Sequence, residues 1–256
     1  MEVTTPINIV LSSAGVTFNL VNIAVFLQQD WRTNNVTLTL LSLSITDLLS
    51  LVSCLVFDAF TVLQMQLPTN TCDYPAVQYY IVSWTLGLFS DISSLTTVLV
   101  SLERCLCIIT PLHVQSLFSV KRTLAALAVV WLLVGLSYTV LFSTLTLQWT
   151  YDHRYNISRL TIGLSKERMK VEIGHNISNT VLLPSFSELA VIINTVVMVT
   201  GLKRSSKFQK KSTHASSDLK KQSCNLCKVQ KACNCGLLYI WYIHRLQYTK
   251  CVVYLL

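Results

Sequence analysis

The stretch Ser101-Leu-Glu-Arg-Cys-Leu-Cys-Ile-Ile-Thr-Pro-Leu-His-Val114 closes a long apolar segment with an acid–arginine pair and then a Pro-Leu turn. Charged side chains at the end of a membrane helix are costly, because ionisable groups lose favourable solvation there. We therefore interpret Glu103 and Arg104 as residues that serve a function. The interpretation of the rest of the chain depends on this segment.

The composition of the chain indicates a membrane protein. Of its 256 residues 52% are hydrophobic and only 12% are charged, whereas soluble domains carry about 25% charged residues. A helix needs roughly 20 apolar residues to cross a bilayer, and hydrocarbon requires the backbone to bond within its own segment. We therefore predict an all-α transmembrane helix bundle. Its predicted spans are residues 7–27, 38–62, 80–108, 123–145 and 181–202.

The basic residues predict the orientation of these helices. Residues 203–231 carry nine Lys and Arg against one acid, Asp218. By the positive-inside rule the N-terminus lies outside and this segment lies in the cytosol. The loop at 146–180 also carries basic residues although we place it outside, and longer loops follow the rule less closely. The net charge of +8 thus reflects topology, with the lipid bilayer and not nucleic acid as the partner.

The segment quoted first resembles the rhodopsin-like (class A) G-protein-coupled receptors. Glu103-Arg104-Cys105 matches their Asp/Glu-Arg-Tyr/Cys switch, and Pro111-Leu112 matches the inner-loop Pro-Leu that docks on the G protein. The stretch from Val77 to Ile108 resembles the corresponding stretch of chemosensory-type receptors of molluscs. The resemblance implies an extracellular small-molecule or peptide ligand, a heterotrimeric G protein as partner, a plasma-membrane location and no enzymatic activity. It also implies that Glu103 holds Arg104 at rest.

A second match lies in the stretch Leu41-Ser-Leu-Ser-Ile-Thr-Asp-Leu-Leu49, which is similar to the helix-two motif of these receptors. An ionisable group near the middle of the bilayer is expensive and usually functional. In the family this Asp, here Asp47, binds a sodium ion together with a helix-three Ser, here Ser93, and Asn19 matches the helix-one Asn. Sodium is the one cofactor that the resemblance implies. Trp131 matches the helix-four Trp, which has a packing role.

Acidic residues suggest a ligand pocket in the outer half of the bundle. Asp91, with Ser90 beside it, lies 13 residues before Arg104, or about 20 Å along a helix. Asp58 and Glu188 lie toward the same outer half. Three acids around one cavity would favour a cationic ligand. The alternative is that each acid pairs with a hydroxyl or with another helix and touches no ligand.

The predicted outer loops carry sequons but lack the usual disulfide. The position that matches the family's helix-three cysteine is Tyr79, and residues 146–180 contain no Cys, so we expect no disulfide there. Asn156 and Asn176 each begin an Asn-Ile-Ser sequon, which predicts a glycoprotein.

We expect the resemblance to cover residues 1–221 and to fail in a divergent tail, residues 222–256. That tail lacks the Cys-Trp-x-Pro and Asn-Pro-x-x-Tyr motifs of helices six and seven, and its apolar stretch 236–256 contains three basic residues. Its four clustered cysteines (224, 227, 233 and 235) suit palmitoylation better than zinc, and the leading interpretation is that the segment has no evolved role. A receptor of this kind signals by moving helix six outward, so this tail predicts a chain that is unable to couple. Retention in the ER is the alternative to the plasma membrane if the chain is truncated.

Three other classes of function stay open at this stage. A non-signalling membrane partner that dimerises with full-length relatives would share every motif with a receptor. A transporter or channel would show an internal repeat with interrupted helices, which we do not find. An intramembrane enzyme would use Asp47 and Asp91, the two deep acids, but their motif context favours a receptor.

Overall fold

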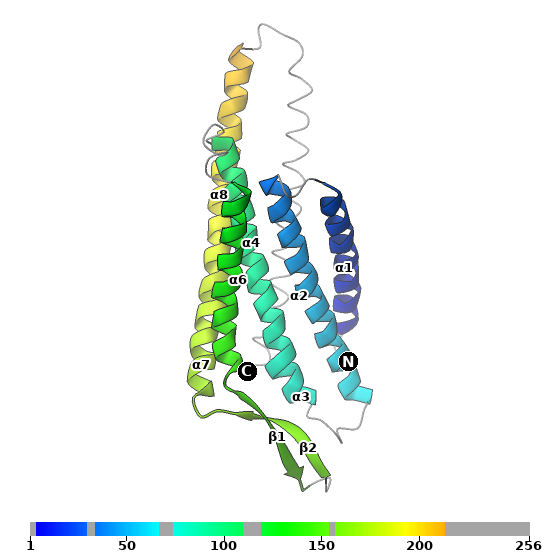
Figure 1. The fold of residues 1–256 in the computed structure, drawn as a ribbon. Coiled ribbons are helices and arrows are strands. Elements are labelled where there is room, and N and C mark those ends of the chain that lie inside the picture. Colours follow the sequence, from blue (N-terminus) through cyan, green and yellow to red (C-terminus); the bar gives the residue numbers. More distant parts are fainter. Residues whose placement is uncertain (1–3, 30–33, 67–73, 110–118, 154–156, 213–256) are drawn as a thin grey trace. The chain divides into compact units, whose positions relative to one another are not determined.

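The computed structural model describes residues 4–29, 34–66, 74–109, 119–153 and 157–212 (Figure 1). The chain divides into two compact units, residues 1–195 and 196–256, and the side-chain contacts of interest lie within the first. In the described part, five helical segments are long and apolar enough to cross a membrane. The prediction of an all-α transmembrane bundle with five spans is confirmed.

Three of the five spans are single helices, and two contain a π-helical turn. The single helices are α1 (Thr4–Gln28), α2 (Asn35–Gln66) and α6 (Val120–Phe142). The third span consists of α3 (Tyr74–Val77), η1 (Gln78–Ser83) and α4 (Trp84–Ile109). The fifth consists of α7 (Arg168–His175), η2 (Asn176–Leu182) and α8 (Leu183–Ser212).

Helix α2 packs against both α1 and α4, and α4 packs in turn against α6 (Figure 1). The buried apolar core lies between α4 and α6 and consists of Ile92, Val134, Tyr138 and Leu141. On α6, Leu132 and Leu133 are each 64% exposed. An apolar helix that buries one side and exposes leucines on another is what a lipid-facing helix requires.

The segment between the fourth and fifth spans differs from the predicted loop. Strand β1 (Leu145–Asp152) pairs antiparallel with β2 (Ile157–Leu164) to form a hairpin, and β2 contacts α3. The fifth span begins at Arg168 and not at residue 181. Its first turns were missed because they are polar, and these polar side chains bond to other helices.

Candidate functional site

Glu103 lies near the end of α4, where its side chain is anchored to α2. The residue is only 2% exposed, and Glu103 Oε2 accepts a hydrogen bond of 3.0 Å from Thr39 Oγ1. Arg104, the next residue, is half-buried, and its charge acts on Glu103. The hydrogen bond that holds the carboxylate therefore comes from Thr39, a residue that the motifs did not single out.

The neighbours of this pair in the predicted coupling motif are placed only in part. Cys105 is 4% exposed, so its thiol is packed between helices. Pro111 and Leu112 lie outside the described residues.

Two of the three residues in the predicted sodium-type cluster are hydrogen-bonded to each other. Ser93 Oγ donates a hydrogen bond to Asp47 Oδ1 and so connects α4 to α2. Asn19 Nδ2 instead donates to the carbonyl oxygen of Gly15, one turn back in its own helix, at 3.0 Å. Carboxylate and hydroxyl oxygens are ligands that suit a hard cation, so Asp47 and Ser93 fit a sodium ion chemically.

Asp91 is buried and is bonded to other parts of the protein. Tyr138 Oη donates to Asp91 Oδ2 at 2.8 Å, and the Asn179 side chain supplies a further hydrogen bond. Tyr138 reaches this position beside Gly87, where an added Cβ would lie 2.8 Å from the tyrosine oxygen. The bonds to Tyr138 and Asn179 are those expected of an acid that pairs within the protein.

The other residues of the predicted cationic pocket have different surroundings. Asp58 is 1% exposed, and its Oδ2 atom lies 4.0 Å from the Cys54 sulfur. Glu188 on α8 is exposed. The Ser90 carbonyl accepts a hydrogen bond from Ser94 Oγ. A shared pocket for a cation stays a prediction.

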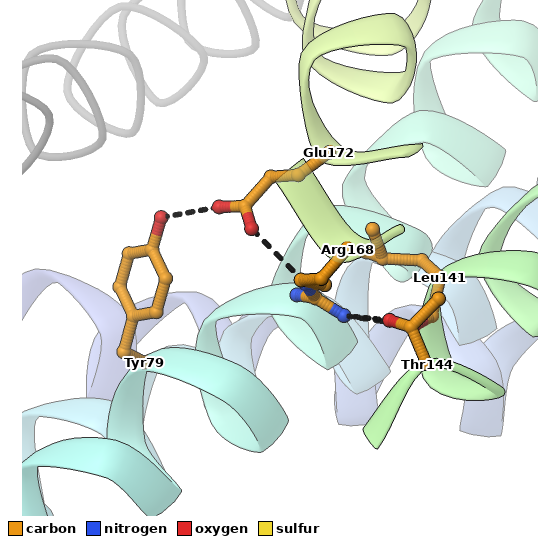
Figure 2. A network of polar contacts seen from close by, with 5 residues as sticks. All are labelled: Tyr79, Leu141, Thr144, Arg168 and Glu172. Carbon is orange, nitrogen blue, oxygen red and sulfur yellow. Dashed lines mark hydrogen bonds and ion pairs between the residues drawn. The ribbon is translucent and has the colours of Figure 1, made fainter. Parts of the chain in front are cut away.

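A buried ion pair connects three helical spans at the hairpin end of the first unit (Figure 2). Arg168 Nε lies 3.0 Å from Glu172 Oε2, and Glu172 Oε1 accepts a hydrogen bond of 2.8 Å from Tyr79 Oη. Arg168 Nη1 donates to the Leu141 carbonyl oxygen and to Thr144 Oγ1, each at 2.8 Å. We name these five residues the outer clamp. It ties the start of the fifth span to the third span and to the end of α6.

The outer clamp includes Tyr79, the position that the rhodopsin-like resemblance aligned with a helix-three cysteine. Its partner Glu172 lies 93 residues later. A charge-assisted hydrogen bond therefore connects the third span to the fifth at this position.

Two further predictions concern single side chains. Trp131 contacts Phe89 of α4, with ring centroids 6.3 Å apart, which agrees with a packing role, although 36% of the residue is exposed. Asn176 lies in η2 and not in a loop, so its predicted placement was wrong. Asn156 lies outside the described residues.

The sequence as a whole matches one family. Residues 9–248 match the family model of serpentine-type seven-transmembrane G-protein-coupled chemoreceptors called Srx. The chain belongs to this family. A search of curated proteins finds no match. The Srx match identifies a multi-pass membrane protein of the chemosensory-receptor type, in agreement with the five apolar spans. It also continues past Lys221, where we expected the resemblance to end.

The residues that the sequence analysis of this Srx chain missed are hydrogen-bond partners of the acids that it singled out. Thr39, Tyr138 and Asn179 bond to Glu103 and Asp91 from other helices. Hydroxyl and amide side chains are common in membrane helices, so nothing in the sequence distinguishes these three. The spacing of Arg168 and Glu172 was a usable signal, because an opposite-charge pair at i and i+4 is typical of a helix.

Proposed function

We propose that this Srx chain is a chemosensory receptor of the plasma membrane that transmits ligand binding to a heterotrimeric G protein. This proposal departs from the expectation drawn from the tail, because the Srx match continues past Lys221 to residue 248. The hairpin end of the first unit faces the outside, and the end that carries Glu103 and Arg104 faces the cytosol. The observation that carries the proposal is the buried Glu103, fixed by Thr39 beside a half-buried Arg104. This is the place where the rhodopsin-like resemblance puts the G-protein switch.

The proposed mechanism uses α4 as the connection between the two ends. Trp84 begins this helix at the hairpin end, and Arg104 lies about 30 Å further along the axis. In the resting state Thr39 holds the Glu103 carboxylate against α2. Movement of α4 relative to α2 breaks this bond and frees Arg104 to meet the G protein, while Pro111 and Leu112 dock beside it.

The Asp47–Ser93 bond joins the same two helices nearer the middle of the bundle. We propose that a sodium ion binds at these two oxygen-bearing side chains and stabilises the resting packing of α2 on α4. A bound ion stabilises only the state that holds its ligands in place. Sodium would therefore oppose the same movement that releases Arg104.

A second candidate function is that of a membrane partner that contacts a G protein or a related receptor without activating it. The observation in its favour is that residues 222–256 lack the Cys-Trp-x-Pro and Asn-Pro-x-x-Tyr motifs. This candidate and the first both use the Arg104 end. They differ in whether contact with the G protein leads to nucleotide exchange.

Both candidates are tested by measuring contact and activation separately. Energy transfer between luciferase-tagged chain and fluorescent Gα subunits reports contact in cells, and nucleotide exchange on the purified G protein reports activation. We expect Arg104→Gln to weaken contact by about tenfold, because Arg104 loses a charge-assisted bond. The matched control is Arg159→Gln on β2, at the hairpin end.

Each outcome of this experiment decides between the candidates. Contact that depends on Arg104 and is accompanied by exchange supports a signalling receptor. Contact without exchange supports the second candidate. Contact that is equal in the wild type, Arg104→Gln and Arg159→Gln overturns the proposed role of this end.

A further inference from the structure

Three neighbouring side chains at the hairpin end of the first unit each have a buried nitrogen atom without a hydrogen-bond partner among the described residues. These atoms are Arg168 Nη2, Trp84 Nε1 and His175 Nδ1. The rings of Trp84 and His175 have centroids 5.2 Å apart, and Arg168 Cζ lies 5.7 Å from the Trp84 ring centroid. Arg168 is 3% and His175 9% exposed. We name these three residues the donor cluster.

Two of the three atoms can only donate, and the third donates in one tautomer of His175. Trp84 Nε1 and Arg168 Nη2 have no other role. His175 Nε2 lies 3.1 Å from Asn179 Nδ2, and the role of each ring nitrogen depends on the tautomer. In the tautomer with the proton on Nδ1, Nε2 accepts from the Asn179 amide and Nδ1 donates.

The remaining nitrogens of Arg168 are already used. Nε is paired with Glu172, and Nη1 donates to Leu141 and Thr144. Glu172 in turn accepts from Tyr79, so both of its oxygens are occupied. Nη2 is thus the one guanidinium nitrogen left to bind something else. A buried donor without a partner costs free energy, and three on neighbouring side chains are difficult to explain as packing.

The surroundings of the donor cluster are aromatic. The Arg168 guanidinium lies over the Tyr80 ring, 5.2 Å from its centroid, and the Tyr138 ring meets the His175 ring at 4.4 Å. Trp84 directly follows the π-helical turn η1, and His175 directly precedes η2. Such wide turns occur frequently at functional sites.

We propose that the donor cluster binds the carboxylate of a small aromatic carboxylic acid, which is the ligand class of this receptor. A carboxylate only accepts hydrogen bonds and has room for several donors, so it suits Trp84 Nε1 and Arg168 Nη2 and, in the tautomer with the proton on Nδ1, His175 as well. A cation offers no acceptor and is repelled by Arg168. The proposal rests on the proposed function, which places this end outside the cell.

The test uses the purified full chain in lipid nanodiscs and three probes of the same shape. Phenylacetate carries the carboxylate, phenylacetamide is its neutral counterpart and 2-phenylethylammonium is a cation. Binding is measured by saturation-transfer NMR, and unfolding by a thermal ramp with and without probe. We expect phenylacetate to bind about tenfold more tightly than the amide, since charged hydrogen bonds are the stronger ones. We expect no binding of the cation.

Trp84→Phe separates a ligand site from a packing role. The substitution removes one unpaired donor but keeps an aromatic ring, so we expect the chain without probe to melt at a higher temperature. Phenylacetate should bind it about tenfold more weakly. His175→Phe is a second variant for which we expect only the weaker phenylacetate binding, because it also removes the bond to Asn179. Trp131→Phe on α6 should change neither quantity.

Equal binding of phenylacetate and the amide, or no binding of any probe, overturns the proposal. Unchanged phenylacetate affinity in both Trp84→Phe and His175→Phe also overturns it. Because no G protein takes part, this experiment fails independently of the proposed function. Phenylacetate binding with no G-protein contact would refute the proposed function alone.

Discussion

At the residue scale, the hydroxyl group of Thr39 holds the side chain of Glu103. Its carboxylate is buried, and the hydrogen bond from Thr39 connects two helices across 64 residues of sequence. Interhelical hydrogen bonds in membranes contribute about 0.6 kcal/mol on average and up to about 1.7 kcal/mol. Removing this donor also leaves a buried oxygen without its partner.

We therefore predict that Thr39→Val lowers the free energy of unfolding by about 1 kcal/mol, measured by equilibrium unfolding in mixed SDS micelles. Thr39→Ser, which keeps the hydroxyl, should stay within a few tenths of a kcal/mol of the wild type. Thr17→Val is the matched control, because Thr17 is exposed and bonds only to the Ser13 carbonyl of its own helix. An equal loss in Thr17→Val and Thr39→Val would contradict this role of Thr39.

Gly87 is the second residue whose identity has a local cause. An added Cβ would approach Tyr138 Oη to 2.8 Å, so Gly87→Ala has to displace the hydroxyl that bonds Asp91. We predict that Gly87→Ala destabilises the fold by about 1–3 kcal/mol, the usual cost of overpacking. The measurement is the same unfolding assay. In Tyr138→Phe, which lacks the hydroxyl, the added cost of Gly87→Ala should be smaller.

Gly135 on α6 provides the control for Gly87, because nothing lies within 4 Å of an added Cβ there. Gly135→Ala should be neutral or stabilising by up to about 1 kcal/mol, since Ala favours a helix over Gly. Similar losses in the two Ala variants would show that the contact with Tyr138 does not determine the effect.

At the scale of elements, the outer clamp holds the start of the fifth span against the third span and the end of α6 (Figure 2). Tyr79→Phe and Glu172→Gln each remove a charge-assisted contact, which is worth about 1.5–3 kcal/mol. We predict that both variants lower stability by amounts in this range. The two changes should be less than additive in a double-mutant cycle, because both affect the Tyr79–Glu172 bond, although Glu172→Gln also removes the ion pair with Arg168.

Glu167→Gln is the matched control at the residue directly before the same helix, since Glu167 pairs with Lys170 at the exposed surface. An exposed pair contributes little, so this variant should unfold like the wild type. Fully additive losses for Tyr79→Phe and Glu172→Gln would contradict the clamp.

The elements themselves were predictable where hydropathy determines them and were missed elsewhere. The ends of the first four spans differ little from the predicted ones, because long apolar runs allow only a helix in lipid. The alternation of Leu145, Leu147, Trp149 and Tyr151 is a strand signal that hydropathy does not weigh. The start at Arg168 is polar, and it depends on Tyr79 and Leu141, which no local pattern includes.

At the scale of the whole molecule, the sequence indicated the family type but not the contacts. The match to Srx chemoreceptors over residues 9–248 agrees with the receptor interpretation drawn from Glu103 and Arg104. The acids Asp47 and Asp91 were singled out from the sequence, and each is hydrogen-bonded to another helix. Their partners Ser93 and Tyr138 come from other helices, and only for Ser93 did a family motif supply the pairing.

The orientation of the chain in the membrane underlies the whole account, because it decides which end meets a G protein. The most direct measurement places an epitope tag after His153, between the hairpin strands, or after Trp31, between α1 and α2. Antibody staining of cells is then compared before and after permeabilisation. We predict that the tag after His153 is stained on intact cells and the tag after Trp31 only after permeabilisation. The reverse pattern would place Arg104 outside the cell and contradict the proposed function.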